Sequence, residues 1–343
     1  EIVFGDWSSD VCSSDLRLGA SYNNTYIMDG TENATHYFFT GYTVYSDTNR
    51  SLFVMQTTKT GSIERAVTWR NASDAGIATG GLAIAINDES TLLYVGGYYD
   101  LALTNGYISY GSAILICYNL ETLTVSWIRH DLSYDMYVNV HESGNSLFEF
   151  GGERIEDILV IGGYIVIAAS LLMKIEDPRS GQSGEYFYGI CTFVAKLNAT
   201  TGSTVWDYKK NVIFFYNPPM TINPRPSVAR QLYYRSATDQ IFVLCDLKFT
   251  VFGEENFGVN QFIVIIKYNL VEGTHLTDAN AGTSNLWISA DLTANNQYSN
   301  EETVTSLAFN NDQNLYCAGV RRVGSGIGTN TPFLYAQIGR AHV

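Results

Sequence analysis

The chain has 343 residues, of which 46% are hydrophobic and 16% charged, and its formal net charge is −14. This composition excludes an intrinsically disordered chain, and 30 glycines beside only 6 prolines exclude a collagen-like or proline-rich one. An acidic surface repels phosphate backbones, so the charge argues against nucleic acid as a partner.

Both ends of the chain resemble translated sequencing-library adaptor. Residues 1–16 read EIVFGDWSSDVCSSDL, which back-translates largely to a common adaptor strand, and residues 338–343 read IGRAHV, which fits its reverse complement. We expect both segments to be adaptor-derived, and residues 17–337 to be a single domain fragment. Without the two ends, 30 acidic and 19 basic residues remain, so the acidic character persists.

Two phrases alternate along the chain. The first is a strand, a polar turn and a second strand, and its copies begin at Gly81, Glu156, Ala229 and Val304, spaced by 75, 73 and 75 residues. The second is an apolar strand, a turn rich in Thr and Asn, and a short strand closing in Trp. Its copies end at Trp69, Trp127, Trp206 and Trp287. Recurrence at this period is the signature of a repeat architecture.

Four strands, named a to d, are expected in each unit. In the clearest unit they lie near Leu82–Asn87, Leu92–Gly97, Ala113–Asn119 and Val125–Arg129. The apolar run Ile158–Met173 is shorter than the roughly 20 residues of a membrane helix. Its central Gly162-Gly163 instead predicts two strands joined by a tight turn. The pattern predicts an all-β fold, a β-propeller of four-stranded blades, with a β-sandwich array as the alternative.

The repeat bounds predict about three whole and two partial blades of an incomplete ring. They cover residues 34–72 (lacking strand a), 78–131, 155–210, 228–291 and 303–337 (lacking strand d), and residues 17–33 are expected to be the tail of a preceding blade. The indoles should fill the wedges between blades. We predict seven structural repeat anchors: Trp69, Trp127, Trp206, Trp287, Gly41, Gly97 and Gly319.

The phrase FVAKLNATTGSTVW, which contains Lys196, Asn198, Gly202 and Trp206, resembles two repeat families. One is the seven-bladed β-propeller repeat called SBBP, and the other is the pyrroloquinoline-quinone (PQQ) enzyme-like repeat. LYVGGYY and YFFTGYT look closer to the first family. The resemblance implies a propeller. The third and fourth units depart from it, with Ala168-Ala169 and Leu244-Cys245 where the others have Gly.

No catalytic, cofactor-binding or metal-binding set stands out. Cys117, Cys191, Cys245 and Cys317 form no C-x-x-C pair, and we expect buried free thiols, with a disulfide as the alternative. The histidines are isolated and are expected to be surface or satisfied residues: His36, His130, His141 and His275. A quinoprotein dehydrogenase would need a calcium site and usually a cysteine pair, and the sequence offers no adjacent cysteines.

The b–c connections are the long ones, at Asp100–Ser112, Ser170–Ile190, Lys248–Gln261 and Val320–Pro332. Since they join the same two strands in every blade, they should share one face, and such insertions mark a binding face. The candidate binding-face residues are Tyr98, Tyr99, Asp100, Arg321 and Arg322.

The sequence therefore predicts a non-catalytic scaffold that binds a protein or glycan through this face. The alternative is a fragment of a PQQ-dependent dehydrogenase-like enzyme whose cofactor-binding blades are missing. We expect no membrane span in this chain. Five N-glycosylation sequons permit the extracellular or cell-surface location that we favour.

Overall fold

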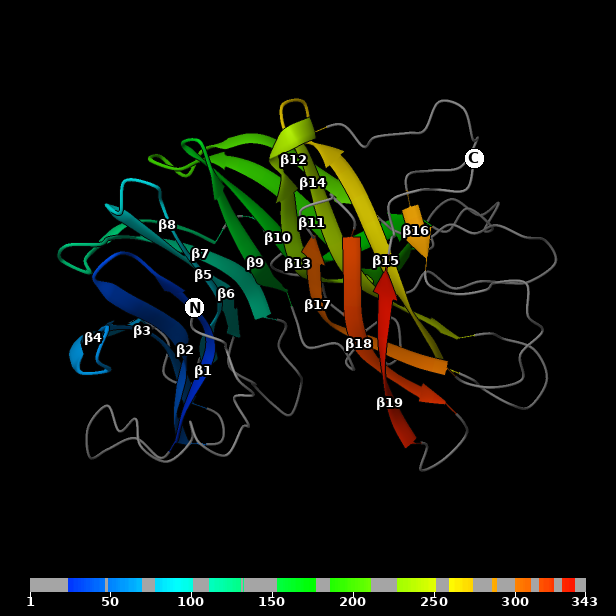
Figure 1. Cartoon of the computed structure of the whole chain (residues 1–343), viewed down its shortest axis with the longest axis horizontal. Coiled ribbons are helices and arrows are strands. Elements are labelled where there is room, and N and C mark those ends of the chain that lie inside the picture. Colours follow the sequence, from blue (N-terminus) through cyan, green and yellow to red (C-terminus); the bar gives the residue numbers. More distant parts are fainter. Residues whose placement is uncertain are drawn as a thin grey trace. The chain divides into compact units, whose positions relative to one another are not determined.

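A computed structural model describes residues 24–46, 49–69, 78–100, 111–130, 132, 153–176, 186–210, 227–250, 259–273, 286–288, 300–309, 315–323 and 329–336. This part of the chain is all-β, with strands β1 to β19 and a single 3-10 turn at Ser236–Thr238 (Figure 1). The strands form three four-stranded antiparallel sheets and one seven-stranded sheet, which supply the four-stranded blades of a β-propeller. The expected fold class is confirmed.

Three sheets are simple four-stranded meanders, coloured from blue to green in Figure 1. Blade 1 consists of β1 (Asn24–Glu32), β2 (His36–Ser46), β3 (Asn49–Thr58) and β4 (Ile63–Trp69). Blade 2 consists of β5 (Ala78–Ile86), β6 (Leu92–Asp100), β7 (Gly111–Asn119) and β8 (Val125–Arg129). Blade 3 consists of β9 (Arg154–Ile161), β10 (Tyr164–Glu176), β11 (Tyr186–Asn198) and β12 (Thr204–Lys210). As predicted, Gly162-Gly163 separates β9 from β10.

The remaining strands form one larger sheet. Blade 4 consists of β13 (Ser227–Arg235), β14 (Gln240–Thr250), β15 (Val259–Asn269) and the short β16 (Leu286–Ile288). β17 (Asn300–Phe309), β18 (Leu315–Val323) and β19 (Thr329–Ala336) follow as a three-stranded partial blade. A parallel bridge between Gln261 and Glu301 joins β15 to β17.

The first blade differs from the sequence-based expectation. The segment before residue 34 was expected to belong to a preceding blade, which left blade 1 without strand a. Instead β1 pairs antiparallel with β2 from Asn24↔Val44 to Glu32↔Tyr37, so blade 1 has all four strands. The segment YIMDGTE was missed because it lacks the apolar run that marks the other a strands.

Contacts divide the chain into two units. Unit 1 contains residues 1–138, 151–166 and 197–203, and unit 2 contains residues 139–150, 167–196 and 204–343. Blades 1 and 2 lie in unit 1, together with the turn that joins β11 to β12. Blade 4 lies in unit 2 with most of β10, β11 and β12.

The core of unit 1 lies between blades 1 and 2. Alternate residues of β2 and β3, such as Phe38 and Leu52, pack against alternate residues of β6 and β7, such as Val95 and Ile116. Each of these side chains is at most 1% exposed. Trp69 is half-buried and packs against the same cluster, as the wedge-filling role predicts. Burial of this size stabilises by about 1.5–3 kcal/mol for each large side chain.

Strand a carries a β-bulge opposite a small residue of strand b. The register shifts after Ile27 in β1 and after Gly81 in β5, whose partners on strand b are Gly41 and Gly97. A Cβ on Gly41 would lie 1.8 Å from the Tyr26 carbonyl oxygen, and one on Gly97 would lie 1.9 Å from that of Gly80. No side chain fits there, so both glycines are structural. Gly319 pairs with Val304, where the bulge of β17 begins.

The turn between strands c and d has one design in three blades. Its first residue is Asn119, Asn198 or Asn269, whose side-chain Oδ1 accepts a backbone N–H three residues later at 2.9–3.1 Å. The fifth residue is left-handed in every copy: Leu123, Gly202 or Gly273. The Thr/Asn-rich turn expected from the sequence is therefore an Asx turn.

The tryptophan of each of two blades packs on the c–d turn of the next blade. A Cβ added to Gly202 would lie 2.9 Å from the Trp127 ring, and a Cβ added to Gly273 would lie 2.4 Å from the Trp206 ring. This packing supports the anchor role proposed for Trp127 and Trp206. Trp287 lies in β16, and its side chain is outside the described residues.

Side-chain donors fasten the same turns. The carbonyl oxygen of Leu270 accepts hydrogen bonds from Trp206 Nε1 at 3.1 Å and from Lys196 Nζ at 3.2 Å. The corresponding carbonyl of blade 3, on Ala199, accepts one from the Tyr94 hydroxyl at 3.1 Å. Burial lowers the pKa of Lys196, and the charge of Asp239 opposes that shift. The c–d turns of blades 3 and 4 are thus bonded to the preceding blade.

Cys117 and Cys245 are free and buried, as expected. Burial raises the pKa of the Cys117 thiol to about 12, which leaves it protonated and unreactive at neutral pH. The side chains of Cys191 and Cys317 lie outside the described residues.

The different surroundings of the two indole N–H groups predict that replacing each tryptophan by phenylalanine changes the free energy of unfolding by a different amount. Trp206 Nε1 has an acceptor, whereas Trp127 Nε1 is buried without one among the described residues. Trp206→Phe removes a hydrogen bond, and Trp127→Phe removes an unsatisfied donor at the same loss of ring volume. Trp206→Phe should therefore lower the free energy of unfolding by about 1–2 kcal/mol more than Trp127→Phe. Urea titration of both variants measures this difference, and equal losses would contradict the assigned hydrogen bond.

Candidate functional site

The two ends of a blade differ in their connections. Because neighbouring strands run antiparallel, the a–b and c–d turns leave one end, called here the turn end. The b–c connections and the passages to the next blade leave the other, called here the connector end. At the turn end of blade 2 the turns are short and hydrogen-bonded, at residues 87–91 and 119–124.

The connector end carries segments of 2 to 24 residues, while those at the turn end have 2 to 5 residues except for the 16-residue segment 270–285 of blade 4. The b–c segments are 47–48, 101–110, 177–185, 251–258 and 324–328, and the passages between blades are 70–77, 130–153, 211–226 and 289–299. Most of these residues lie outside the described ranges. Sequence reasoning identified only the b–c segments, because the passages share this end through strand direction, which a repeat count does not reveal.

The b–c segments are shorter than predicted because strands b and c extend as hairpins. The paired strands reach Asp100↔Gly111 in blade 2, Thr250↔Val259 in blade 4 and Val323↔Thr329 in the partial blade. In blade 3, β10 runs to Glu176 and β11 begins at Tyr186. Pairing satisfies backbone groups that an irregular loop would leave to water.

The predicted binding-face residues have different surroundings. Tyr99 is 6% exposed and belongs to the core between blades 1 and 2, so its expected place on the binding face is wrong. The half-buried Tyr98 points to the other side of β6, and its ring lies against Gly80. Asp100 ends β6, and its side chain lies outside the described residues.

Arg321 and Arg322 lie near the end of β18. They pair with Glu302 and Glu301 on β17 and with Thr331 and Asn330 on β19. Their backbone therefore stands at the connector end, as the sequence predicts, while their side chains lie outside the described residues. Their place in a binding face remains a proposal.

Sequence reasoning missed a row of aromatic and cationic side chains across blade 1. The rings of Tyr26 and Tyr42 stack with centroids 4.9 Å apart and planes 28° apart. The Arg50 guanidinium carbon lies 5.1 Å from the centroid of Tyr42. The row crosses β1, β2 and β3 near the connector end and finishes at Tyr26, which is 40% exposed. It was missed because β1 itself was not recognised.

Asp29 joins the two blades beside this row. It stands at the bulge of β1, where its Oδ1 accepts the Gly30 N–H and its Oδ2 accepts the Ile84 N–H of β5, both at 2.8 Å. Burial raises the pKa of Asp29, and the two backbone hydrogen bonds oppose that rise. A carboxylate with both oxygens occupied by backbone donors fixes blade 1 to blade 2 and is not a base for substrate chemistry.

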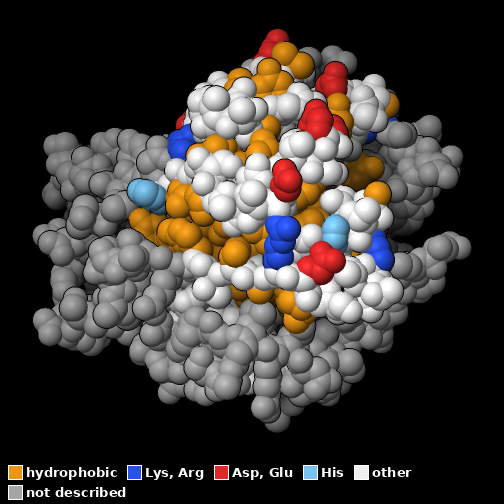
Figure 2. Space-filling view, turned by 90° about the vertical axis from the view of Figure 1, so that its left-hand side faces the viewer, with side chains coloured by type: hydrophobic (Ala, Val, Ile, Leu, Met, Phe, Trp, Pro, Cys, Tyr) orange, Lys and Arg blue, Asp and Glu red, His pale blue; other side chains and the backbone are white. Residues whose placement is uncertain are grey.

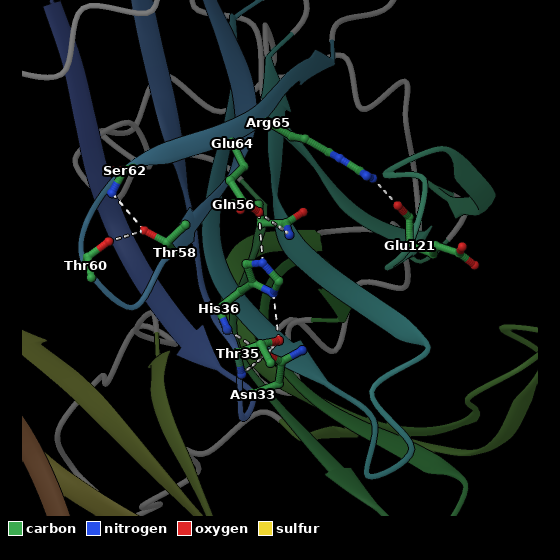
Figure 3. A network of polar contacts seen from close by, with 10 residues as sticks. All are labelled: Asn33, Thr35, His36, Gln56, Thr58, Thr60, Ser62, Glu64, Arg65 and Glu121. Carbon is green, nitrogen blue, oxygen red and sulfur yellow. Dashed lines mark hydrogen bonds and ion pairs between the residues drawn. The ribbon is translucent and has the colours of Figure 1, made fainter.

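A second polar network lies at the turn end of blade 1 (Figure 3). His36 lies between Thr35 Oγ1, 2.8 Å from Nδ1, and Glu64 Oε2, 2.8 Å from Nε2. Gln56 Nε2 donates to the same Glu64 oxygen at 3.2 Å. Asn33 Oδ1 accepts the backbone N–H groups of Thr35 and His36 and closes the turn. His36 is therefore a satisfied histidine, as expected from the sequence.

The other histidines add no site. His130 packs edge-on against Tyr99, with ring centroids 6.3 Å apart, while His141 and His275 lie outside the described residues. Within the described ranges, no group of three or more His, Cys, Asp or Glu side chains is placed to hold a metal ion. The described part of the chain also contains no helix long and apolar enough to cross a membrane. Among the coloured residues of the face shown in Figure 2, blue and red side chains are scattered between orange and white ones, so these residues form no single-sign patch.

No family model matches this sequence, and no curated protein matches it. Solved structures with a similar fold include the β-propeller domain of the Trilobed protease from Pyrococcus furiosus, at 9% identity and a TM-score of 0.34, covering 92% of this chain and 96% of that one. A glycoside hydrolase aligns at 11% identity and a TM-score of 0.38, covering 94% and 90%. Drosophila Semaphorin 2a aligns at 8% identity and a TM-score of 0.34, covering 90% and 68%.

The raised pKa of Asp29 predicts a pH-dependent effect of Asp29→Asn. Between the ordinary carboxyl pKa of 3.8 and the raised pKa of the folded state, the folded chain holds a proton that the unfolded chain releases. The wild type should therefore lose stability relative to Asp29→Asn as the pH rises through this window. Thermal unfolding of both proteins from pH 3 to pH 8 measures the difference. A difference that is constant with pH, or that moves toward the wild type, would contradict the assignment.

Proposed function

We propose that this chain is a non-catalytic β-propeller scaffold that binds a protein or glycan at the connector end of its blades. The b–c face expected from the sequence is part of this end. The observation that carries the proposal is the contrast between the two ends. The c–d turns of blades 2 to 4 begin with one Asx-turn design, and those of blades 3 and 4 are bonded to the preceding blade, while the segments at the connector end differ from blade to blade.

Because of this contrast, the contacts that hold blades together and the residues proposed to bind a ligand lie at opposite ends of the blades. A change in the first residues of these c–d turns alters a contact that holds two blades together, so these positions tolerate little variation. A change beyond the last paired residues of β6 and β7 alters no described blade contact. Binding residues commonly stand on loops that a rigid scaffold positions. Tyr98, Asp100, Arg321 and Arg322 lie where strands approach these segments, and they remain proposed binding residues.

The side chains described at the connector end suit binding more than catalysis. They are aromatic, amide and guanidinium groups, which supply stacking and hydrogen bonds, and no described acid–base pair accompanies them. No described residue supports the alternative function, a quinone-dependent dehydrogenase. An extracellular or cell-surface location fits a protein or glycan ligand, and we include it in the proposal.

Trimming the connector end tests the proposal. Residues 101–110 and 251–258 follow directly paired residues, so Asn-Gly can close each hairpin as a two-residue turn. The wild type should bind a ligand on an array of glycans and purified extracellular proteins, and the trimmed variant should bind it at least about tenfold more weakly.

The matched control lengthens the turn end. Inserting Gly-Ser between Gly162 and Gly163, in an open turn with no atom near either Cβ position, should leave affinity unchanged. Thermal unfolding verifies that both variants fold. The proposal would be overturned if trimming left the affinity unchanged or if the control lost as much affinity as the trimmed variant. It would also be overturned if the wild type bound nothing on the array.

A further inference from the structure

Tyr26 is the open end of the stacked row on blade 1. Tyr42 is covered on both sides along the row, by Arg50 and by Tyr26. Within the described chain Tyr26 is covered on one side only, because β1 is the edge strand of its sheet. Among the described residues, no other ring or cation lies over Tyr26, and 40% of the residue is exposed.

Asn24 stands beside Tyr26 on the same face of β1. Residues two apart on a strand point to the same side, and both precede the bulge that follows Ile27. Asn24 is exposed, and within the described chain its amide forms no side-chain hydrogen bond. Its partner across the sheet is Val44, which in turn pairs with Arg50. One ring face and one amide with donors and an acceptor are thus presented together.

The stack is held in place before any ligand arrives. Tyr26 and Tyr42 are directly paired residues of two hydrogen-bonded strands, and the buried Thr25 and Thr43 flank them on the opposite face. Gly41, next to Tyr42, lies against the Tyr26 carbonyl oxygen and brings the two strands close. A preorganised ring loses little conformational entropy on binding.

We propose that Tyr26 and Asn24 form a subsite for a neutral sugar ring, in which the apolar C–H face of the sugar stacks on Tyr26 and its hydroxyl groups bond to the Asn24 amide. This inference rests on the proposed function and names its ligand class. The net charge of −14 opposes anionic glycans such as sulfated or sialylated chains. The Arg50 cation already occupies the far face of the stack, so a second cation gains less there than a neutral ring does.

A microarray of neutral gluco-, manno-, xylo- and galacto-oligosaccharides, printed beside sulfated and sialylated glycans and a lysine-rich peptide, tests the subsite. The full chain should bind neutral oligosaccharides and neither of the charged classes. Tyr26→Ala should weaken that binding by about tenfold, because it removes the stacking surface. Tyr26→Phe keeps the ring and should keep the binding.

Two further variants keep the test independent of folding. Asn24→Ala changes only an exposed amide, so it should weaken binding several-fold with an unchanged unfolding midpoint. Tyr164→Ala removes a tyrosine of similar exposure, 37%, at the turn end of blade 3, and should leave binding unchanged.

The outcomes separate the subsite from the scaffold function. No binding to any neutral oligosaccharide, or wild-type binding by both Tyr26→Ala and Asn24→Ala, would overturn the subsite. If trimming residues 101–110 and 251–258 still abolished binding to another ligand, the scaffold function would stand without it. If the chain bound only the lysine-rich peptide, and Tyr26→Ala abolished that binding, the sugar assignment would be wrong and the ligand would be cationic.

Discussion

The packing of Trp127 and Trp206, the closing tryptophans of blades 2 and 3, on the c–d turn of the next blade is the contact on which the joining of these blades depends. A sheet with two apolar faces is stable only when neighbours cover both of them. Trp127 on Gly202 and Trp206 on Gly273 provide that cover at the turn end, where the Ala199 and Leu270 carbonyls accept bonds from the preceding blade. Leu123 holds the left-handed position in blade 2, and its strained backbone is offset by burial in the cluster that includes Trp69.

This arrangement leaves the opposite end free to differ between blades. The Asx turns must keep one geometry because an indole packs on two of them, whereas the segments beyond Asp100, Thr250 and Val323 follow hairpins that are already paired. Asp29 adds a further contact between blades 1 and 2, because it accepts the Ile84 N–H of β5. A rigid end and a variable end in one repeat are what a binding scaffold requires.

The sequence predicted the four-stranded repeat and the four strands of blade 2, because these depend on local apolar patterns and a fixed spacing. It missed β1, since YIMDGTE has only three consecutive apolar residues and so lacks the apolar run of the other a strands, and the Tyr26–Tyr42–Arg50 row was missed with it. Tyr99 was misplaced because a Tyr-Tyr pair at a strand end does not show which ring turns to the core. Strand parity decides that point, and it places Tyr99 with Val95 and Leu93.

Hydrogen–deuterium exchange of the full chain, with and without a mixture of neutral gluco-, manno- and xylo-oligosaccharides, tests the central claim most directly. The account predicts that amides of the c–d turns around Asn119 and Asn198 exchange slowly in both samples, because blade contacts protect them. It also predicts that the oligosaccharides slow exchange in peptides covering Asn24–Tyr26 and the connector end. Fast exchange in the c–d turns without ligand, or protection by ligand at the turn end alone, would contradict the account.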